Sequence, residues 1–452
     1  MQVEQLEPGA SRRAPMGWNS WDCYGTTVTE EEVLANARFM SEHLLAYGWD
    51  TIVVDIQWYE PGARAHGYND NADLLLDPYG RQLPVPARFP SAAPGADGVS
   101  PGFTALADQI HALGLKFGVH IMRGIPRKAV RLDLPILGTD VTAAQVANTD
   151  STCAWNSDNY GLNHDHPGAQ AYYDSQVAQL ASWGVDFIKA DDMLAPYHDR
   201  EIAAYAQAIT NSGRDIALSL SPGTHLSLNW LEHLNANATM WRVSDDLWDR
   251  WEDVAEQFAR MAQWAPHQRA GGWADADMLP LGRIGIRAER GEPRDSRLTL
   301  DEQQTLMSLW TISKSPLMFG GDLPTSTPQT IELLTNPLLM SMYDRAPAAR
   351  QIKDEGALKI WATEFHQDES LYVALFNTGE EPLDVALDVA DLGLPRADNL
   401  TAVNIWTGGS HQIVGTTLPN FDPSKSQYPQ LTATVAAHGV THFKIITHRE
   451  DA

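Results

Sequence analysis

The chain reads Phe187-Ile188-Lys189-Ala190-Asp191-Asp192 near its middle, an apolar run that ends in charged residues. Three further runs join a strand-like core to polar or aromatic residues: Gly17-Trp18-Asn19-Ser20-Trp21, Val54-Asp55-Ile56-Gln57-Trp58 and Trp241-Arg242-Val243-Ser244-Asp245-Asp246. In a (β/α)8 barrel, the residues that do chemistry lie at the carboxyl ends of the strands and therefore meet at one mouth. The four runs predict such a TIM barrel, with carboxylates, a lysine and tryptophans around its mouth.

Between about residues 14 and 340, strand-like runs alternate with amphipathic helices, which is the pattern of a parallel α/β fold. Thr29 and Glu32 have the spacing of a capping box and predict that a helix begins there. Strands are predicted at Thr51–Ile56, Leu115–Ile121, Val185–Asp191, Asp215–Ser221, Thr239–Ser244 and Pro316–Gly320. The seventh strand is predicted somewhere before Trp273.

The stretch 59–101 is polar, rich in proline and glycine, and has little periodicity. A loop of this length is uncommon inside a compact domain and is usually functional. Because it follows a strand at the predicted mouth, we expect it to form a wall of the site.

The pattern changes after Asp344. Leu358–Thr363, Ser370–Asn377 and Thr441–Ile446 have the character of strands joined by short polar turns, and no segment has a clear helical period. We predict an antiparallel β-sandwich there. The predicted domains are a catalytic barrel at residues 1–345 and a sandwich at 346–452.

The chain has 452 residues, a net charge of −26 and only two cysteines, Cys23 and Cys153. Nucleic acid and an anionic membrane surface would both repel this charge, so neither is an expected partner. The cysteines are predicted to be free thiols, since a secreted enzyme of this size more often carries disulfides. The first residues lack the features of a signal peptide, and no run of about 18 apolar residues could span a bilayer. A cytoplasmic protein is expected.

Two separated acid pairs beside a lysine and tryptophans suggest glycoside hydrolysis, which needs two carboxylates across the scissile bond. A carboxylate that attacks an anomeric carbon must stay ionised, and Lys189 lies two residues before Asp191 on the same face of the strand. Asp191 is therefore the predicted nucleophile. Asp245 or Asp246 is the predicted general acid/base, and the residue pattern by itself does not separate the two.

Other interpretations follow from the same residues. Lys189 and Asp191 also fit a structural ion pair, and Asp245-Asp246 fits a solvated turn after a strand. Asp55, Asp191, Asp192 and His120 fit the ligand set of a metal-dependent barrel hydrolase. A carbohydrate-binding protein with a decayed active site is a different class again. Such a protein would be expected to have lost at least one charged residue of the site. The four concerned, Asp191, Asp246, Lys189 and Arg242, are all present.

Several motifs occur in a particular order: Pro15-Met16-Gly17-Trp18-Asn19-Ser20-Trp21, Lys189-Ala190-Asp191, Arg242-Val243-Ser244-Asp245-Asp246, Asp275-Ala276-Asp277-Met278-Leu279 and Ser315-Pro316-Leu317-Met318-Phe319-Gly320-Gly321-Asp322-Leu323. Together they resemble glycoside hydrolase family 27, the α-galactosidase or melibiase family of clan D. The resemblance extends over residues 15 to about 325, and the β-rich C-terminal segment fits it too.

The resemblance implies a retaining double displacement. It assigns the nucleophile to Asp191 and the acid/base to Asp246, which lies four residues after Arg242. It further implies that Trp21 packs against the sugar. Asp55, Lys189 and Arg242 would hydrogen-bond sugar hydroxyls.

This chain departs from the family pattern at the sugar. Where the family usually has Asp-Asp-Cys-Trp, this chain has Ile56 after Asp55. Ile56 therefore replaces an acid that would accept hydrogen bonds from the hydroxyls near C4 and C6. His120 stands where a tyrosine is common, and Arg123 adds a cation nearby. The segment around Ser221 replaces the usual Cys-Glu-Trp, which contacts the 2-position. The remaining expected substrate-binding residues are Ile56, Trp58, His120, Arg123 and Ser221.

Hydrolysis of terminal α-D-galactosides is the first expectation, because it dominates the family. Ile56 favours β-L-arabinopyranosides as the alternative, since β-L-arabinopyranose is α-galactose-like but lacks the C6 hydroxymethyl group. An α-glucan-acting member is a further alternative. No cofactor and no metal are implied. The expected partner is a glycoside or oligosaccharide, and a homo-oligomer is left open.

Overall fold

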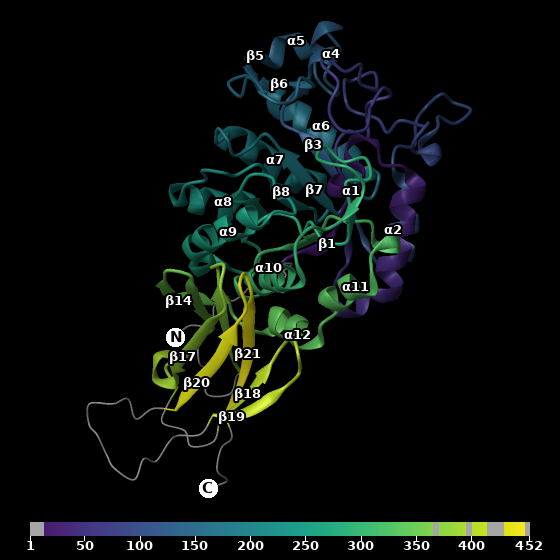
Figure 1. Ribbon diagram of the computed structural model, residues 1–452. Helices are drawn as coiled ribbons and strands as arrows, with labels where there is room; N and C mark the ends of the chain where they lie inside the picture. Colours follow the sequence, from purple (N-terminus) through teal and green to yellow (C-terminus); the bar gives the residue numbers. More distant parts are fainter. Residues whose placement is uncertain (1–12, 365–369, 395–399, 414–428, 448–452) are drawn as a thin grey trace, which may run out of the picture. The chain divides into compact units, whose positions relative to one another are not determined.

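The computed structural model describes residues 13–364, 370–394, 400–413 and 429–447 (Figure 1). The chain forms two compact units, and each draws on separate stretches of sequence. The first unit comprises residues up to 247 together with 269–296 and 317–330. The second comprises 248–268, 297–316 and the residues from 331 onward. Because the units interleave along the chain, the domain boundary expected after residue 345 stays a prediction.

The first unit is built on a sheet of eight parallel strands in the order β10-β9-β8-β7-β3-β2-β1-β13. Their bounds are β1 Met16–Asn19, β2 Thr51–Val54, β3 Lys116–Met122, β7 Phe187–Asp191, β8 Ala217–Leu220, β9 Met240–Arg242, β10 Trp273–Asp275 and β13 Leu317–Phe319. A parallel bridge between Leu279, just after β10, and Phe319 on β13 joins the two ends of the sheet. The strands are almost entirely buried, as parallel strands covered on both faces must be. The predicted TIM barrel is confirmed.

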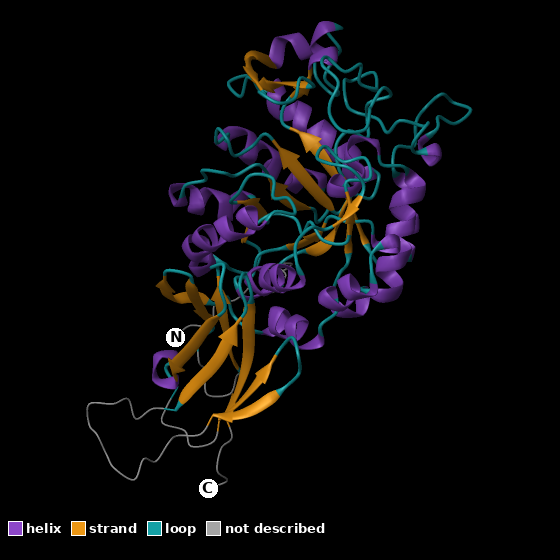
Figure 2. Cartoon of the chain, viewed as in Figure 1, coloured by secondary structure: helices purple, strands orange, loops and turns teal. Residues whose placement is uncertain are grey.

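Helices alternate with these strands (Figure 2). The helices are α1 Trp21–Tyr24, α2 Glu30–His43, α3 Thr104–Ala112, α4 Arg127–Arg131, α5 Ala143–Val146, α6 Gly168–Ser182, α7 Asp199–Ser212, α8 Leu231–Asn237, α9 Trp251–Trp264, α10 Leu300–Ile312, α11 Pro328–Leu334 and α12 Pro337–Arg345. The predicted capping box begins α2: the Glu32 amide donates to Thr29 Oγ1 at 3.4 Å, and the Thr29 amide donates to Glu32 Oε2 at 2.9 Å.

Two long excursions leave the barrel at the carboxyl ends of its strands. The first connects β2 to α3, and its only short helix is η3 (Pro90–Ala92), which confirms the predicted loop. The second follows β3 and contains a small sheet of β4 (Ile125–Pro126), β5 (Ala147–Thr152) and β6 (Asn159–Leu162) in the order β4-β6-β5. The sequence pattern missed this sheet, because its strands are short and β5 is largely solvent-exposed, without apolar alternation.

The predicted barrel strands agree with the structure to within two residues at each end. The seventh strand is the exception: it is Trp273–Asp275 itself, and not a segment before Trp273. The residues just before it form a turn closed by an antiparallel bridge between Arg269 and Gly272. No helix within the described ranges is both long and apolar enough to cross a membrane.

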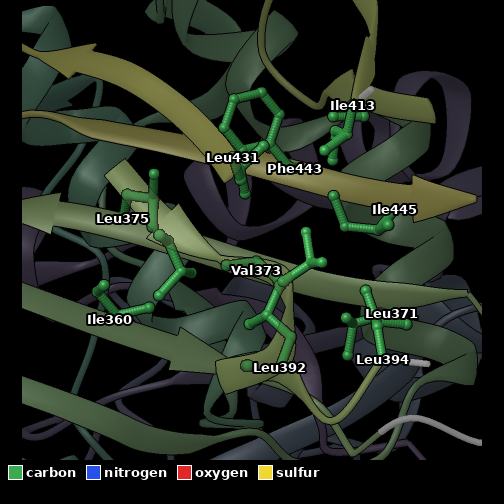
Figure 3. Close-up of a cluster of buried hydrophobic side chains, with 14 of the residues drawn as sticks. Ile360, Leu371, Val373, Leu375, Leu392, Leu394, Ile413, Leu431, Phe443 and Ile445 are labelled. Atoms are coloured by element: carbon green, nitrogen blue, oxygen red, sulfur yellow. The ribbon is translucent and has the colours of Figure 1, made fainter. Parts of the chain in front are cut away.

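The second unit carries an antiparallel β-sandwich, as predicted. A sheet of six strands has the order β14-β15-β16-β21-β18-β19, and β17 pairs with β20. Their bounds are β14 Arg350–Glu355, β15 Leu358–Ala362, β16 Leu371–Asn377, β17 Leu383–Asp388, β18 Leu400–Asn404, β19 Ser410–Ile413, β20 Gln430–Val435 and β21 Val440–Thr447. Leu375, Leu431 and Phe443 are among the buried side chains that fill its core (Figure 3). Helix α10 belongs to this unit, where the Trp406 indole donates to Ser308 Oγ at 2.9 Å.

Candidate active site

A cavity of about 400 Å³ opens at the carboxyl ends of the barrel strands. Its lining residues are Trp21, Asp55, Ile56, Tyr68, Trp155, Lys189, Asp191, Ala195, Pro222, Thr224, Asp245, Asp246, Glu289 and Arg290. This volume lies within the usual range of small-molecule sites. A larger cavity of about 510 Å³ lies at the amino ends of the same strands, the barrel face at which residues serve stability and not chemistry.

Asp191 is the last residue of β7, and hydrogen bonds fix both of its carboxylate oxygens. Its Oδ2 lies 3.1 Å from Nε2 of His120, and its Oδ1 accepts from the amide of Asp192 at 2.9 Å. Burial would raise the pKa of Asp191. The hydrogen bond to His120 and the cations Lys189 and Arg242 outweigh it and hold that pKa far below its ordinary value. The carboxylate is therefore ionised and ready to act as a nucleophile.

Lys189 connects strand β7 to Asp55. Its Nζ donates to Asp55 Oδ2 at 2.8 Å, and Nδ2 of Asn19 donates to the same oxygen at 2.7 Å. Burial would raise the pKa of Asp55, but Lys189 and His120 lower it. Burial would lower the pKa of Lys189, but Asp55 and Asp191 raise it. Both side chains are therefore charged, and together they present donors and acceptors to a polar ligand.

Asp246 lies four residues after the end of β9, and its side chain is 34% exposed. Nη2 of Arg242 donates to its Oδ1 at 2.9 Å. Arg242 is itself buried, with its Nε 3.2 Å from Asp277 Oδ1, and Asp277 Oδ2 accepts from the Leu247 amide at 2.7 Å. Asp277 therefore braces both the arginine and the loop of Asp246. Asp246 therefore lines the cavity beside a fixed cation, where both solvent and a ligand can reach its carboxyl group.

Two further acids near the site are buried. At Asp22, burial and the charges of Asp277 and Asp246 raise the pKa well above its usual value, and its Oδ2 has no hydrogen-bond partner among the described residues. At Asp275, burial and Asp277 raise the pKa to about 7, against the opposing effects of Arg242 and Lys189. The site thus combines acids whose pKa values are raised with acids whose pKa values are lowered.

The whole barrel and sandwich correspond to a known structure. The crystal structure of a family 27 β-L-arabinopyranosidase from Geobacillus stearothermophilus, in complex with arabinose, matches with a TM-score of 0.90. Sequence identity is 43%, and the match covers 97% of this chain and 98% of that chain. The chain belongs to glycoside hydrolase family 27. Residues 158–344 match the family model "Alpha galactosidase A", and residues 355–445 match "Alpha galactosidase C-terminal beta sandwich domain".

Relatives in family 27 are named for activity on different sugars. This glycosidase is 25% identical to Alpha-galactosidase 2 of Arabidopsis thaliana, over 90% of this chain and 86% of that protein. It is 26% identical to the Alpha-N-acetylgalactosaminidase of Rattus norvegicus, over 90% of this chain and 87% of that protein. Family membership therefore establishes a glycosidase and leaves the sugar to the residues of the cavity.

Six of the predicted site residues of this family 27 enzyme line the cavity: Trp21, Asp55, Ile56, Lys189, Asp191 and Asp246. His120 and Arg242 lie behind the lining and hold Asp191 and Asp246. Ser221 is also buried, and its amide donates to Ala190 O at 3.0 Å.

The structure places Trp58 and Arg123 in supporting positions. Trp58 is 1% exposed, its indole donates to His120 O at 2.8 Å, and its ring packs edge-on against Phe103. Arg123 is 3% exposed and is held by Asp192 and Glu201, at 2.7 Å and 3.3 Å. These contacts favour a positioning role for both residues over direct contact with the sugar.

The cavity also contains aromatic residues that sequence reasoning did not assign to it. Tyr68 comes from the loop after β2, and Trp155 comes from the turn between β5 and β6. The prediction that stretch 59–101 walls the site is confirmed, because Tyr68 lies within it. The same stretch also contains Tyr59, Tyr79 and Phe89, so no sequence signal singled out Tyr68, and none singled out Trp155.

Among the described residues, no three His, Cys, Asp or Glu side chains group as possible metal ligands. His164 pairs with Glu201, Nε2 to Oε2 at 2.9 Å. The acids of the site are held by protein donors: Asp55 by Lys189, and Asp192 by Arg123.

Proposed function

We propose that this family 27 glycosidase releases terminal β-L-arabinopyranose from β-L-arabinopyranosides with retention of configuration, and that it cleaves α-D-galactosides less well. The observation that carries the proposal is Ile56. It lines the cavity directly after Asp55, where the family pattern has a second acid for hydroxyls near C4 and C6. An apolar surface there suits a sugar without a C6 hydroxymethyl group.

The proposal reverses the order in which the sequence pattern ranked the two sugars. The Geobacillus stearothermophilus neighbour, at 43% identity, is a β-L-arabinopyranosidase, whereas the α-galactosidase of Arabidopsis thaliana is 25% identical. Similarity to the Geobacillus stearothermophilus enzyme therefore favours the same sugar as Ile56 does. Galactosides remain the second candidate, since the two sugars share the ring stereochemistry that Asp55 and Lys189 would contact.

The proposed reaction has two steps. Asp191 attacks the anomeric carbon while Asp246 gives its proton to the glycosidic oxygen, so that the C–O bond breaks and the aglycone leaves as an alcohol. Asp246, now a carboxylate, takes a proton from water, and the water oxygen displaces Asp191 from the sugar. His120 and Lys189 keep Asp191 ionised before each turnover, and Arg242 orients Asp246.

The sugar is tested by kcat/KM on matched nitrophenyl β-L-arabinopyranoside and α-D-galactoside. The wild type should prefer the arabinoside. An apolar pocket discriminates against an added polar group only modestly, so galactoside cleavage should be measurable. Ile56→Asp should move the ratio of the two kcat/KM values toward the galactoside by about 10-fold or more, because a charged acceptor is restored for the 6-hydroxyl.

Ile56→Leu is the matched control, since it conserves volume and polarity, and its ratio should stay near that of the wild type. A wild-type preference for galactosides, with no shift in Ile56→Asp, would overturn the proposed sugar. Retention is measured separately, by the NMR spectrum of the first-formed sugar anomer. An inverted anomer would contradict the role of Asp191.

A further inference from the structure

Three aromatic side chains form one side of the cavity: Trp21, Tyr68 and Trp155, here called the aromatic wall. Trp21 stacks on Tyr68, with ring centroids 5.7 Å apart and ring planes 20° apart. Tyr68 in turn contacts Trp155, with centroids 5.8 Å apart and planes at 45°. Trp21 is 6% exposed, whereas Trp155 is 41% exposed. The wall therefore runs without a gap from the interior of the cavity to its rim.

The inner end of the wall adjoins the catalytic carboxylates. Burial and the negative charges of Asp191, Asp55 and Asp246 hold the pKa of Tyr68 well above its usual value. The phenol therefore keeps its proton and can donate a hydrogen bond. The terminal sugar, seated on Asp191, would lie beside Tyr68, and whatever is attached to that sugar would extend toward Trp155.

The outer end of the wall is a large apolar surface that solvent reaches. An exposed tryptophan contiguous with an active-site cavity has the geometry to stack on the apolar face of a sugar ring. Neither Tyr68 nor Trp155 lies on a barrel strand; both belong to the two excursions from the barrel. These excursions thus supply a surface that the barrel and its catalytic pair do not.

The charge of the cavity lining further restricts which ligands can bind there. Its lining contains five acidic residues and two cations: Asp55, Asp191, Asp245, Asp246 and Glu289 against Lys189 and Arg290. The acids outnumber the cations even when Asp246 carries the proton that it gives to the leaving group. A cavity lined mainly by one sign of charge repels ligands of that sign. An anionic aglycone, such as a uronic acid, is disfavoured, and a neutral sugar is not.

We propose that the outer end of the aromatic wall, at Trp155, is an aglycone subsite that binds a neutral sugar ring next to the scissile bond. The substrate is then an oligosaccharide, or a polysaccharide side chain, with the cleaved sugar at its end. This inference rests on the proposed function only in placing the terminal sugar at Asp191.

The test compares two substrates with the same terminal sugar: a disaccharide with a neutral pyranose as its second unit, and the methyl glycoside. Each variant's kcat/KM is divided by that of the wild type on the same substrate. The difference in leaving-group reactivity between the two substrates then cancels. Trp155→Ala should lose about 5- to 10-fold on the disaccharide and less than about 2-fold on the methyl glycoside. Trp155→Phe, which keeps an aromatic ring, should recover most of the disaccharide rate.

Trp230→Ala is the matched control, because Trp230 is also a solvent-exposed tryptophan, at 37%, but stacks on Tyr197 outside the cavity lining. It should change neither rate. Equal losses of Trp155→Ala on both substrates, with wild-type activity on each, would overturn the aglycone subsite. Absence of any wild-type hydrolysis of arabinosides and galactosides would instead overturn the proposed function.

The effect of ligand charge on the rate of cleavage can be measured separately. The wild type should cleave a disaccharide with a uronic acid as its second unit more slowly than the neutral disaccharide, and added salt should narrow the difference because it screens the repulsion. Equal or faster cleavage of the anionic substrate at low salt would overturn the proposed neutrality of the ligand.

Discussion

Asp275 is a buried acid whose protonation should control how the stability of the enzyme changes with pH. It is the last residue of β10, 4% exposed, and its Oδ1 accepts from the Asp277 amide at 2.9 Å. Burial and the charge of Asp277 raise its pKa from 3.8 to about 7. In the unfolded chain the same carboxyl ionises near its ordinary value, so folding must retain a proton that the unfolded state releases.

The sign of the effect follows from this difference. A group with a raised pKa in the folded state contributes stability that is fully present below the unfolded pKa and is lost as pH rises through the folded pKa. From the two pKa values, the wild type should lose about 4 kcal/mol of unfolding free energy between about pH 4 and pH 7 through Asp275. Above pH 7 this loss should level off.

Asp275→Asn removes the titration and keeps an oxygen to accept from the Asp277 amide. The difference in unfolding free energy between variant and wild type should therefore grow in favour of the variant from pH 4 to pH 7. Urea titrations at each pH would measure it, with residual glycosidase activity as the probe, because the site lies in one compact unit. Asp108→Asn, at an exposed aspartate of α3, controls for the loss of one carboxylate. A difference that stays constant across this pH range would refute the reasoning.

Three further outcomes are expected. Asp191→Asn should abolish turnover on every substrate, whereas Asp246→Asn should retain activity mainly on aryl glycosides with good leaving groups; equal and total loss on an activated substrate would contradict these roles. Lys189→Met should lower the unfolding free energy by about 3–5 kcal/mol, since it leaves Asp55 charged and buried, and adding Asp55→Asn should recover part of that loss in urea titrations. Activity should survive dialysis against EDTA, because protein donors hold the acids of the site; inactivation that added divalent metal reverses would favour a metal-dependent hydrolase.

The residue pattern was sufficient to predict the barrel, because the spacing of apolar residues reflects which positions are buried. Continuous apolar runs such as Thr51–Val54 are required wherever a parallel strand is covered on both faces, and the acids that end these runs fall at one mouth by topology. The capping box of Thr29 and Glu32 is equally local. Strand ends and the acids at the mouth could therefore be predicted before any contact was known.

Short strands that lack a continuous apolar run could not be predicted in this way. The sheet of β4, β5 and β6 has few residues and little apolar alternation. The seventh barrel strand is only Trp273–Asp275, and an acid that ends a strand looks the same in sequence as an acid in a loop. Patterns of this length do not distinguish a strand from a turn.

The sequence by itself thus determined the fold class, the mouth of the barrel and the acids that meet there, because these depend on periodicity and on strand order. Only the tertiary structure decided which aromatic and cationic residues reach the cavity. Trp58 follows a strand but packs in the core, whereas Trp155, from a distant turn, lines the site. Arg123 is held by Asp192 and by Glu201, 78 residues away. Side-chain surroundings of this kind come from contacts between residues far apart in the chain, which no local pattern contains.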